Sequence, residues 1–328
     1  MKRGDLFSTF FGGEAPKLWC PLISHYDRRG NFDEKRFEAH LAHISPYVGG
    51  YLAPGSTGEG WEMDESEAFE LVDLLRELLS TNRRLLLIGV LETGRGDAAR
   101  SAETIKIRYG YDGDPRALEK QGLCGITVTP PKGSELPDEF IEDELSSVLS
   151  VGLPTALYQL PQVTENRISP ESAAALAREY ENFYLFKDTS GEDRVALDAD
   201  LPDSLFLVRG AEGGYYRWLR GAGGPYHGFL LSTANSFSRD LSQIIAAVDE
   251  GDLEHAKRLT DKLTEVVQEL FRLVEPLPFG NPFANANKTA DHFNAFGRSW
   301  KKGESPMTHA REPIPPEILD AAAELLDT

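Results

Sequence analysis

The sequence has few cysteines and no long apolar run. Only Cys20 and Cys124 occur among 328 residues, and each lies in a short apolar segment. Two such residues indicate buried free thiols in a reducing compartment rather than a disulfide framework. No apolar run approaches the roughly 20 residues needed to cross a bilayer, and the segment before Pro16 lacks the apolar stretch of a signal peptide. We therefore expect a cytoplasmic protein without a membrane partner.

Basic residues are also scarce. The chain has 34 Lys and Arg against 53 Asp and Glu, which gives a net charge of −19 at pH 7. Nucleic-acid binding depends on neutralising phosphates with clustered Lys and Arg, and the sequence has no such cluster. Nucleic acid is therefore not an expected partner, and the acidic excess is typical of a solvated surface.

Short apolar runs alternate along the chain with amphipathic stretches. The runs are mostly continuous, as in parallel strands that are buried on both faces. We expect strands at residues 17–24, 50–54, 85–91, 125–129, 155–160, 183–187, 205–210 and 228–232. Helices are expected between them, including residues 97–108, 138–150, 192–199, 214–220 and 236–249.

Helix starts carry recognisable capping residues. Asp33 precedes one apolar helical stripe, and Asp64 with Glu67 forms a capping-box pattern before another. Ser169 and Pro170 combine an N-cap residue with proline at the first helical position. Each of these three sites predicts the start of a helix.

Eight strands that are each followed by a helix predict an α/β fold, a (β/α)8 TIM barrel, over residues 1–249. A C-terminal helical region is expected over residues 250–328, with helices at 252–274, 286–296 and 317–326. The segment 109–120 is interpreted as an insertion before the fourth strand. A doubly wound open sheet is the main alternative, but no Gly-x-Gly-x-x-Gly follows the first strand.

Active sites of such barrels lie at the carboxyl ends of the strands. Lys187 ends the apolar segment 183–187, and lost hydration favours the neutral, nucleophilic form of an amine there. Such an amine attacks a ketone and forms an imine. Pairing with Asp188, or extension to the solvated rim, is the alternative interpretation of this lysine.

Two other strand ends carry suitable groups. Tyr158 follows Ala156 and Leu157, and its phenol could relay a proton during carbon–carbon cleavage, although a core tyrosine is the commoner case. The turn Gly55–Glu59 has two hydroxyl residues between glycines, a composition that suits a carboxylate or simply caps a helix. Glu59 is interpreted as structural. Trp61 and Glu212 could each face substrate or serve local structure.

Five segments in order resemble the dihydrodipicolinate synthase/N-acetylneuraminate lyase family. They are Gly-Ser-Thr-Gly-Glu (55–59), Thr-Val-Thr-Pro (127–130), Leu-Tyr-Gln-Leu-Pro (157–161), Phe-Lys-Asp-Thr-Ser-Gly (186–191) and Ser-Thr-Ala-Asn (232–235). The resemblance covers roughly residues 17–276 and implies a barrel that performs class I aldolase chemistry.

The resemblance also assigns roles. It implies that Lys187 is the Schiff-base lysine, that Tyr158 is the proton-relay tyrosine, and that Ser56 and Thr57 hold the keto acid's carboxylate, with Thr57 assisting the relay. The main chains of Gly210 and Phe229 fall on pocket-lining positions. The family implies a small 2-keto acid as partner, no metal or organic cofactor, and a homotetramer or homodimer.

Three positions depart from the synthase pattern. Pro131 and Lys132 stand where the family pattern has an aromatic pair, the second a tyrosine donated across a subunit interface. Val163 replaces an arginine that binds the second substrate's carboxylate, and Arg167 could compensate only if its loop bends differently. These departures argue against dihydrodipicolinate synthesis.

The sequence therefore predicts a Schiff-base lyase or aldolase that acts on pyruvate or a 2-keto-3-deoxy sugar acid through Lys187. A sugar-acid dehydratase that uses the same imine is the first alternative. A barrel that binds a keto acid without catalysis is the second. The scattered histidines, including His25 and His292, lack metal-ligand spacing.

Overall fold

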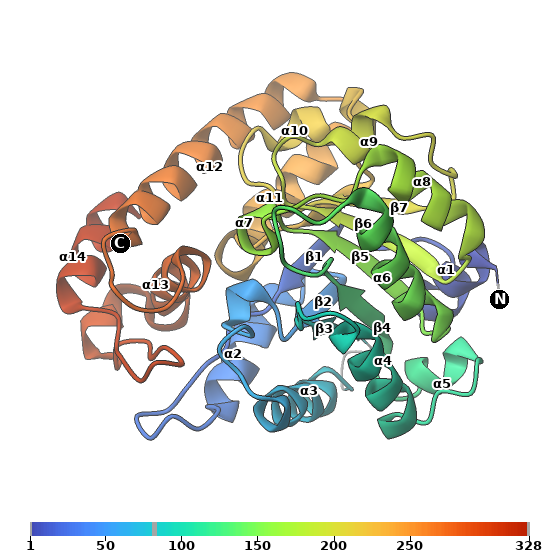
Figure 1. Cartoon of the computed structure of the whole chain (residues 1–328). Coiled ribbons are helices and arrows are strands. Elements are labelled where there is room, and N and C mark those ends of the chain that lie inside the picture. Colours follow the sequence, from blue (N-terminus) through green and yellow to red (C-terminus); the bar gives the residue numbers. More distant parts are fainter. Residues whose placement is uncertain (1, 81–83, 327–328) are drawn as a thin grey trace.

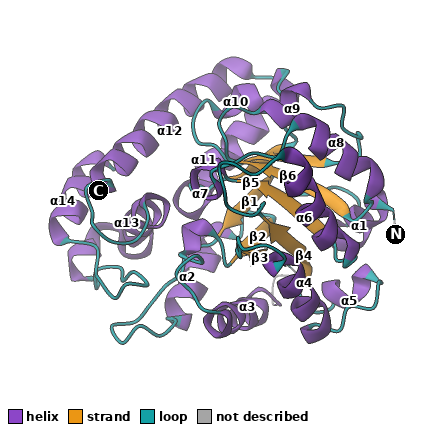
Figure 2. Ribbon diagram, in the orientation of Figure 1, coloured by secondary structure: helices purple, strands orange, loops and turns teal. Residues whose placement is uncertain are grey.

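The chain folds into a closed barrel of eight parallel strands, which a computed structural model describes over residues 2–80 and 84–326. The strands pair in chain order, and β1 also pairs with β8 to close the sheet. Helices surround the strands (Figures 1 and 2). The predicted (β/α)8 barrel is confirmed.

Each predicted strand is present, with ends shifted by at most a few residues. All strand residues except Gly89 and Phe206 are fully buried, which explains why the apolar runs are continuous rather than alternating. The strands are β1 Leu18–Pro21, β2 Gly50–Ala53, β3 Leu85–Val90, β4 Leu123–Val128, β5 Thr155–Gln159, β6 Phe183–Asp188, β7 Phe206–Arg209 and β8 Gly228–Leu230.

The predicted helix starts are realised by the expected hydrogen bonds. The Asp33 carboxylate accepts from the Arg36 amide at 3.1 Å, and Asp64 and Glu67 cap each other's amides at 2.9 and 3.0 Å. Ser169 caps in the same way. The helices of the barrel are α2 Glu34–Ile44, α3 Glu65–Ser80, α4 Asp97–Arg108, α6 Asp138–Ser150, α7 Pro161–Thr164, α8 Pro170–Glu179, α9 Arg194–Asp198, α10 Tyr215–Trp218 and α11 Ala234–Asp249.

Three helices were not predicted, and the short α7 is one of them. Helix α1, Arg3–Phe11, lies beneath the barrel, where the buried Arg3 guanidinium donates to the carbonyl oxygens of Phe183 and Tyr180 and to the Ser204 hydroxyl. The insertion at residues 109–120 contains helix α5, Pro115–Glu119, which packs against α1 and β4. Both segments therefore close the amino-terminal end of the barrel.

The C-terminal region consists of α12 Leu253–Val274, α13 Pro282–Phe296 and α14 Pro316–Leu325, beside the barrel in Figure 1. A second apolar core joins these helices through residues such as Leu270, Ala290 and Leu319. Helix α12 also contributes Ala256 and Leu263 to the barrel's core, so it links the two. No helix in the described part of the chain is long and apolar enough to span a membrane.

Candidate active site

Lys187 and Tyr158 lie side by side on neighbouring strands. The register of β5 and β6 pairs them directly, and the Lys187 Nζ lies 3.8 Å from the centre of the Tyr158 ring. Both side chains are buried, with 4% and 3% of their surface exposed. Among the described residues, the Lys187 amine forms neither an ion pair nor a hydrogen bond. The amine lies over the face of the ring, and among the described residues no hydrogen bond joins it to the Tyr158 hydroxyl.

Asp188 does not pair with Lys187, so that alternative interpretation of the lysine is wrong. The Asp188 Oδ1 accepts from the Ser190 amide at 2.8 Å, and its Oδ2 has no partner within the described residues. Burial raises the pKa of this carboxyl group, and the nearby Asp193 adds to the increase. Successive strand residues point to opposite faces, which separates Asp188 from its neighbour.

The Gly55–Glu59 turn presents its hydroxyl groups at the end of β2. Ser56–Gly58 form one turn of 3₁₀ helix, and Gly58 is packed so closely that a Cβ atom there would lie 2.4 Å from the Leu22 carbonyl oxygen. The Ser56 Oγ accepts from the Trp61 indole at 2.7 Å, which leaves its own proton free to donate. Trp61 therefore orients Ser56.

Gly210 lies against the Schiff-base candidate. A Cβ atom at this position would lie 3.0 Å from the Lys187 Cε and 2.3 Å from the Thr189 Oγ1, so only glycine fits. The predicted role of Phe229 concerns its main chain, and its amide is already bound to the Lys17 carbonyl oxygen at 2.7 Å. The Phe229 ring packs edge-on against Tyr215, with centroids 6.0 Å apart. The pocket-lining role of the Phe229 main chain stays a prediction.

A cavity of about 590 Å³ adjoins Lys187. Its barrel side comes from the segments after β5, β6 and β7, and its opposite side comes from α12 and α13. Lys187 is not part of the lining, but Thr189 and Gly210 on either side of it are. The Thr189 hydroxyl is buried and has no hydrogen-bond partner in the described structure. The principal lining residues are Gln162, Thr189, Gly210, Glu212, Gln268 and Phe271.

Glu212 lies at the edge of this cavity in a shell of donors. Its carboxylate accepts from the Ser232 and Thr233 hydroxyls at 2.8 Å each, from the Thr233 amide at 3.2 Å and from the Tyr215 hydroxyl at 3.1 Å. Burial raises its pKa, and these hydrogen bonds oppose the increase. Glu212 thus joins the segments after β7 and β8 while one side faces the cavity.

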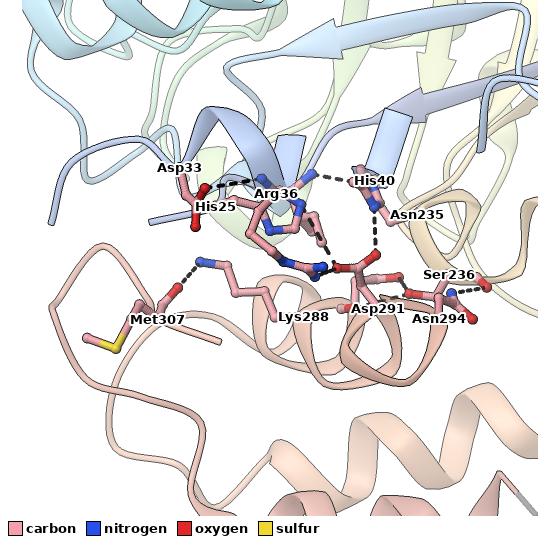
Figure 3. Close-up of polar contacts among 12 residues, drawn as sticks. His25, Asp33, Arg36, His40, Asn235, Ser236, Lys288, Asp291, Asn294 and Met307 are labelled. Carbon is pink, nitrogen blue, oxygen red and sulfur yellow. Dashed lines mark hydrogen bonds and ion pairs between the residues drawn. The ribbon is translucent and has the colours of Figure 1, made fainter. Parts of the chain in front are cut away.

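Glu59 is structural, as the sequence analysis proposed. Its carboxylate forms a fully buried ion pair with Lys288 of α13 and accepts from the His309 amide at 2.9 Å. The Lys288 ammonium also donates to the Met307 carbonyl oxygen at 2.7 Å (Figure 3). The C-terminal region therefore holds the turn that carries Ser56 and Thr57. The sequence carries no sign of this contact, because 229 residues separate the two partners.

A second buried cluster joins the barrel to α13 (Figure 3). The donor atoms of His25, His40 and Asp291 lie within 4.8 Å of one another, which raises the question of a metal site. The His40 Nδ1 lies 2.8 Å from the Asp291 Oδ1, and its Nε2 lies 3.1 Å from the Asn235 Oδ1. The amide of Asn235 donates to two carbonyl oxygens, so its Oδ1 is an acceptor.

Both ring nitrogens of His40 therefore face oxygen atoms at hydrogen-bond distance, which leaves neither of them directed at a metal ion. The Arg36 Nη2 donates to the Asp291 Oδ2 at 2.5 Å. Burial alone would raise the pKa of Asp291, but His40, His25 and Arg36 outweigh it and hold that pKa below its usual range. These contacts describe a network of ion pairs.

The charged residues at and near the departures from the synthase pattern form ion pairs outside the cavity. Lys132 pairs with Glu165 at 3.0 Å, and Arg167 pairs with Glu192 in the exposed loop after β6. Val163 lies in the short helix α7. No lysine or arginine from these positions is among the residues that line the cavity.

Comparisons with known proteins show the family and the fold. A model described as the Dihydrodipicolinate synthetase family matches residues 15–281. A 4-hydroxy-tetrahydrodipicolinate synthase of Agrobacterium fabrum is 26% identical over 315 residues, covering 95% of this chain and 97% of the relative. An Arthrobacter protein named "Probable 5-dehydro-4-deoxyglucarate dehydratase" is 29% identical over 192 residues, which are 57% of each chain. The crystal structure of a dihydrodipicolinate synthase from Bacillus anthracis matches with a TM-score of 0.74 and 15% identity, covering 96% of this chain and 98% of that one.

Proposed function

Because this chain belongs to the dihydrodipicolinate synthetase family and is thus an enzyme of the class I aldolase type, we propose that it cleaves a 2-keto-3-deoxy sugar acid through an imine on Lys187. The observation that carries the proposal is the buried, unpaired Lys187 amine, which contacts Tyr158 beside a cavity much larger than pyruvate requires. The proposed reaction uses no metal or organic cofactor.

The substrate's carboxylate binds at the turn of Ser56 and Thr57, where the Ser56 proton is free to donate. The Lys187 amine attacks the ketone, and loss of water gives an iminium. The C3–C4 bond then breaks, and its electrons pass to the iminium to leave an enamine. Tyr158 relays the proton that the C4 hydroxyl loses as it becomes an aldehyde. Protonation at C3 and hydrolysis release pyruvate and restore the amine.

The chain of the substrate beyond C3 extends into the cavity. The unpartnered Thr189 hydroxyl and the carboxylate of Glu212 offer a donor and an acceptor for substrate hydroxyls. Pro131 and Lys132 replace the aromatic pair of the synthase pattern, and Val163 replaces the arginine that this pattern uses for the second substrate's carboxylate. A sugar acid fits the remaining polar groups better than an amino-acid-derived aldehyde with its own carboxylate.

Dehydration of a sugar acid through the same imine is the second candidate. The 29% identity to the Arthrobacter protein, whose name describes a dehydratase, favours it. The two reactions differ in product, since cleavage releases pyruvate and an aldehyde whereas dehydration conserves the carbon chain. Product analysis of a six-carbon 2-keto-3-deoxy sugar acid therefore tests the proposal. Pyruvate release that Lys187→Ala abolishes supports cleavage, and an intact dehydrated product contradicts it.

A further inference from the structure

A buried arginine joins the two loops that form the barrel side of the cavity. Arg209 ends β7, and only 4% of its surface is exposed. Its Nε and Nη2 donate to the two carboxylate oxygens of Asp193 at 2.9 and 3.1 Å. Asp193 follows the loop after β6, so this two-pronged ion pair ties the β6 loop to β7.

The same guanidinium also holds the β7 loop. Its Nη1 donates to the carbonyl oxygens of Ala211 and Gly213 at 2.6 and 3.2 Å. The segment between them presents Glu212 to the cavity, and the preceding Gly210 lies against Lys187. One side chain thus fixes the backbone of the whole segment 210–213.

The surroundings of the pair are rigid. The Trp218 ring covers the guanidinium at 4.2 Å, and the Tyr226 hydroxyl donates to the Asp193 Oδ1 at 2.6 Å. Asp193 adopts a left-handed backbone conformation, with φ of 58°. A non-glycine residue keeps such a conformation only when its surroundings determine it, and here the buried carboxylate does so.

We propose that the Arg209–Asp193 pair sets the spacing between the β6 and β7 loops and thereby selects for the part of the substrate beyond C3. Arg209 is a positioning residue, because it lies behind the cavity and acts through the backbone of residues 210–213. This role rests on the proposed function, since it presumes that the cavity beside Lys187 holds the substrate chain. Pyruvate has only three carbons, so its binding should not depend on the spacing between the β6 and β7 loops.

The test compares a long substrate with pyruvate in variants of the pair. Arg209→Met leaves the buried Asp193 carboxylate unpaired and can fail to fold, so the decisive variant is the double substitution Arg209→Met/Asp193→Asn, which removes both charges. The double variant should raise the KM for a six-carbon 2-keto-3-deoxy sugar acid at least about 10-fold and change kcat less than about threefold. Borohydride-trapped pyruvate adduct should form as in the parent.

Two controls separate positioning from general destabilisation. Arg178→Met removes an exposed ion pair with Asp200 and should leave every parameter unchanged. Amide exchange at residues 210–213 should be faster in the double variant and unchanged in this control. Arg209→Lys keeps the positive charge but loses the planar guanidinium group. The KM of this variant should therefore lie between the values of the parent and of the double variant.

A folded double variant with the parent's KM and the parent's exchange at 210–213 would overturn the proposal. If the parent enzyme traps pyruvate but the variants show the parent's KM, the proposed role of Arg209 is refuted and the proposed function is not. A parent that traps no pyruvate refutes the proposed function, and this role with it.

Discussion

Two buried lysines, Lys288 and Lys187, lie in different regions of the molecule and have different surroundings. Lys288 lies between the barrel and α13, where it pairs with Glu59, donates to Met307 and lies 4.8 Å from the Tyr26 ring centre. Lys187 lies at the barrel mouth against Tyr158, with no ion pair or hydrogen bond to any residue that the structure describes. Both are at least 96% buried.

We propose that Lys288 is buried in a structural role and Lys187 in a catalytic one. Burial lowers the pKa of Lys288, but the facing Glu59 opposes that change and keeps the charged form compensated. A buried amine without a counterion has no such compensation, and its cost is explained only if the amine is used. The absence of a counterion therefore distinguishes Lys187 from Lys288 better than burial does, and it supports the proposed role of Lys187.

The largest expected effect lies at the barrel mouth. Lys187→Met removes the amine that forms the imine, so kcat/KM for the sugar acid should fall at least about 10⁴-fold. Since this lysine forms no ion pair, the melting temperature should stay near that of the parent. Steady-state kinetics and calorimetry check both parts. Strong destabilisation by this substitution would show that Lys187 stabilises the fold as Lys288 does.

Tyr158→Phe tests the proposed proton relay at the barrel mouth. Loss of a positioned proton relay typically costs about 10²- to 10⁴-fold in rate, so kcat should fall by that amount. The imine should still form, because the phenyl ring retains its packing against Lys187. Rapid-quench borohydride trapping separates imine formation from cleavage. Equal losses in both steps would show that the phenol serves only to hold the lysine.

Lys288→Met should have the converse effect. It leaves Glu59 buried without a counterion, which costs about 3–5 kcal/mol of unfolding free energy. The double substitution Lys288→Met/Glu59→Gln should recover much of that loss, and denaturant melts measure both. Lys17→Met, which breaks an exposed pair with Asp249, is the matched control and should cost no more than about 1 kcal/mol. A similarly small effect at Lys288 would contradict its structural role.

Acidification should weaken the region of α13 by a smaller amount. Burial holds the pKa of His25 well below its ordinary value, as do the charges of His40, Arg36 and Lys288, although Asp291 opposes them. Below about pH 6.5 the unfolded chain binds a proton that the folded chain does not. Above that pH this histidine is neutral in both states and has no proton-linked effect, and below it the histidine lowers stability by up to about 1.4 kcal/mol per pH unit.

The pH dependence of melting tests this expectation. His25→Leu should flatten the decline in stability between pH 6.5 and 5. His255→Asn, at an exposed position on α12, should leave the decline as it is. An identical decline in both variants would place the acid-sensitive group elsewhere.

The barrel could be predicted from the sequence because its determinants are local. Continuous apolar runs specify strands that are buried on both faces, and the caps at Asp33, Asp64 and Ser169 specify helix starts. Helix α1 was missed although its buried residues Leu6, Phe7 and Phe10 stand at helical spacing. Its buried Arg3 could not be predicted, because the partners of Arg3 lie about 180 residues away.

In the site, too, some residues could be predicted from the sequence and others could not. The motifs located Lys187, Tyr158 and Ser56, since each stands at a strand end. The sequence offered no sign of Lys288, Asp291 or the Arg209–Asp193 pair, because polar residues on amphipathic helices and loops normally lie in solvent. Only the fold brings their partners together. The motifs therefore suggest which residues react, and the structure adds the residues that hold the surrounding loops.

The most direct test is borohydride reduction of the enzyme in the presence of pyruvate, followed by intact and peptide mass measurement. The account predicts one pyruvate adduct per chain, located on the peptide that contains Lys187 and lost in Lys187→Ala, while the Lys288 peptide stays unmodified. A folded enzyme that shows no adduct, or an adduct on a lysine other than Lys187, would contradict the account.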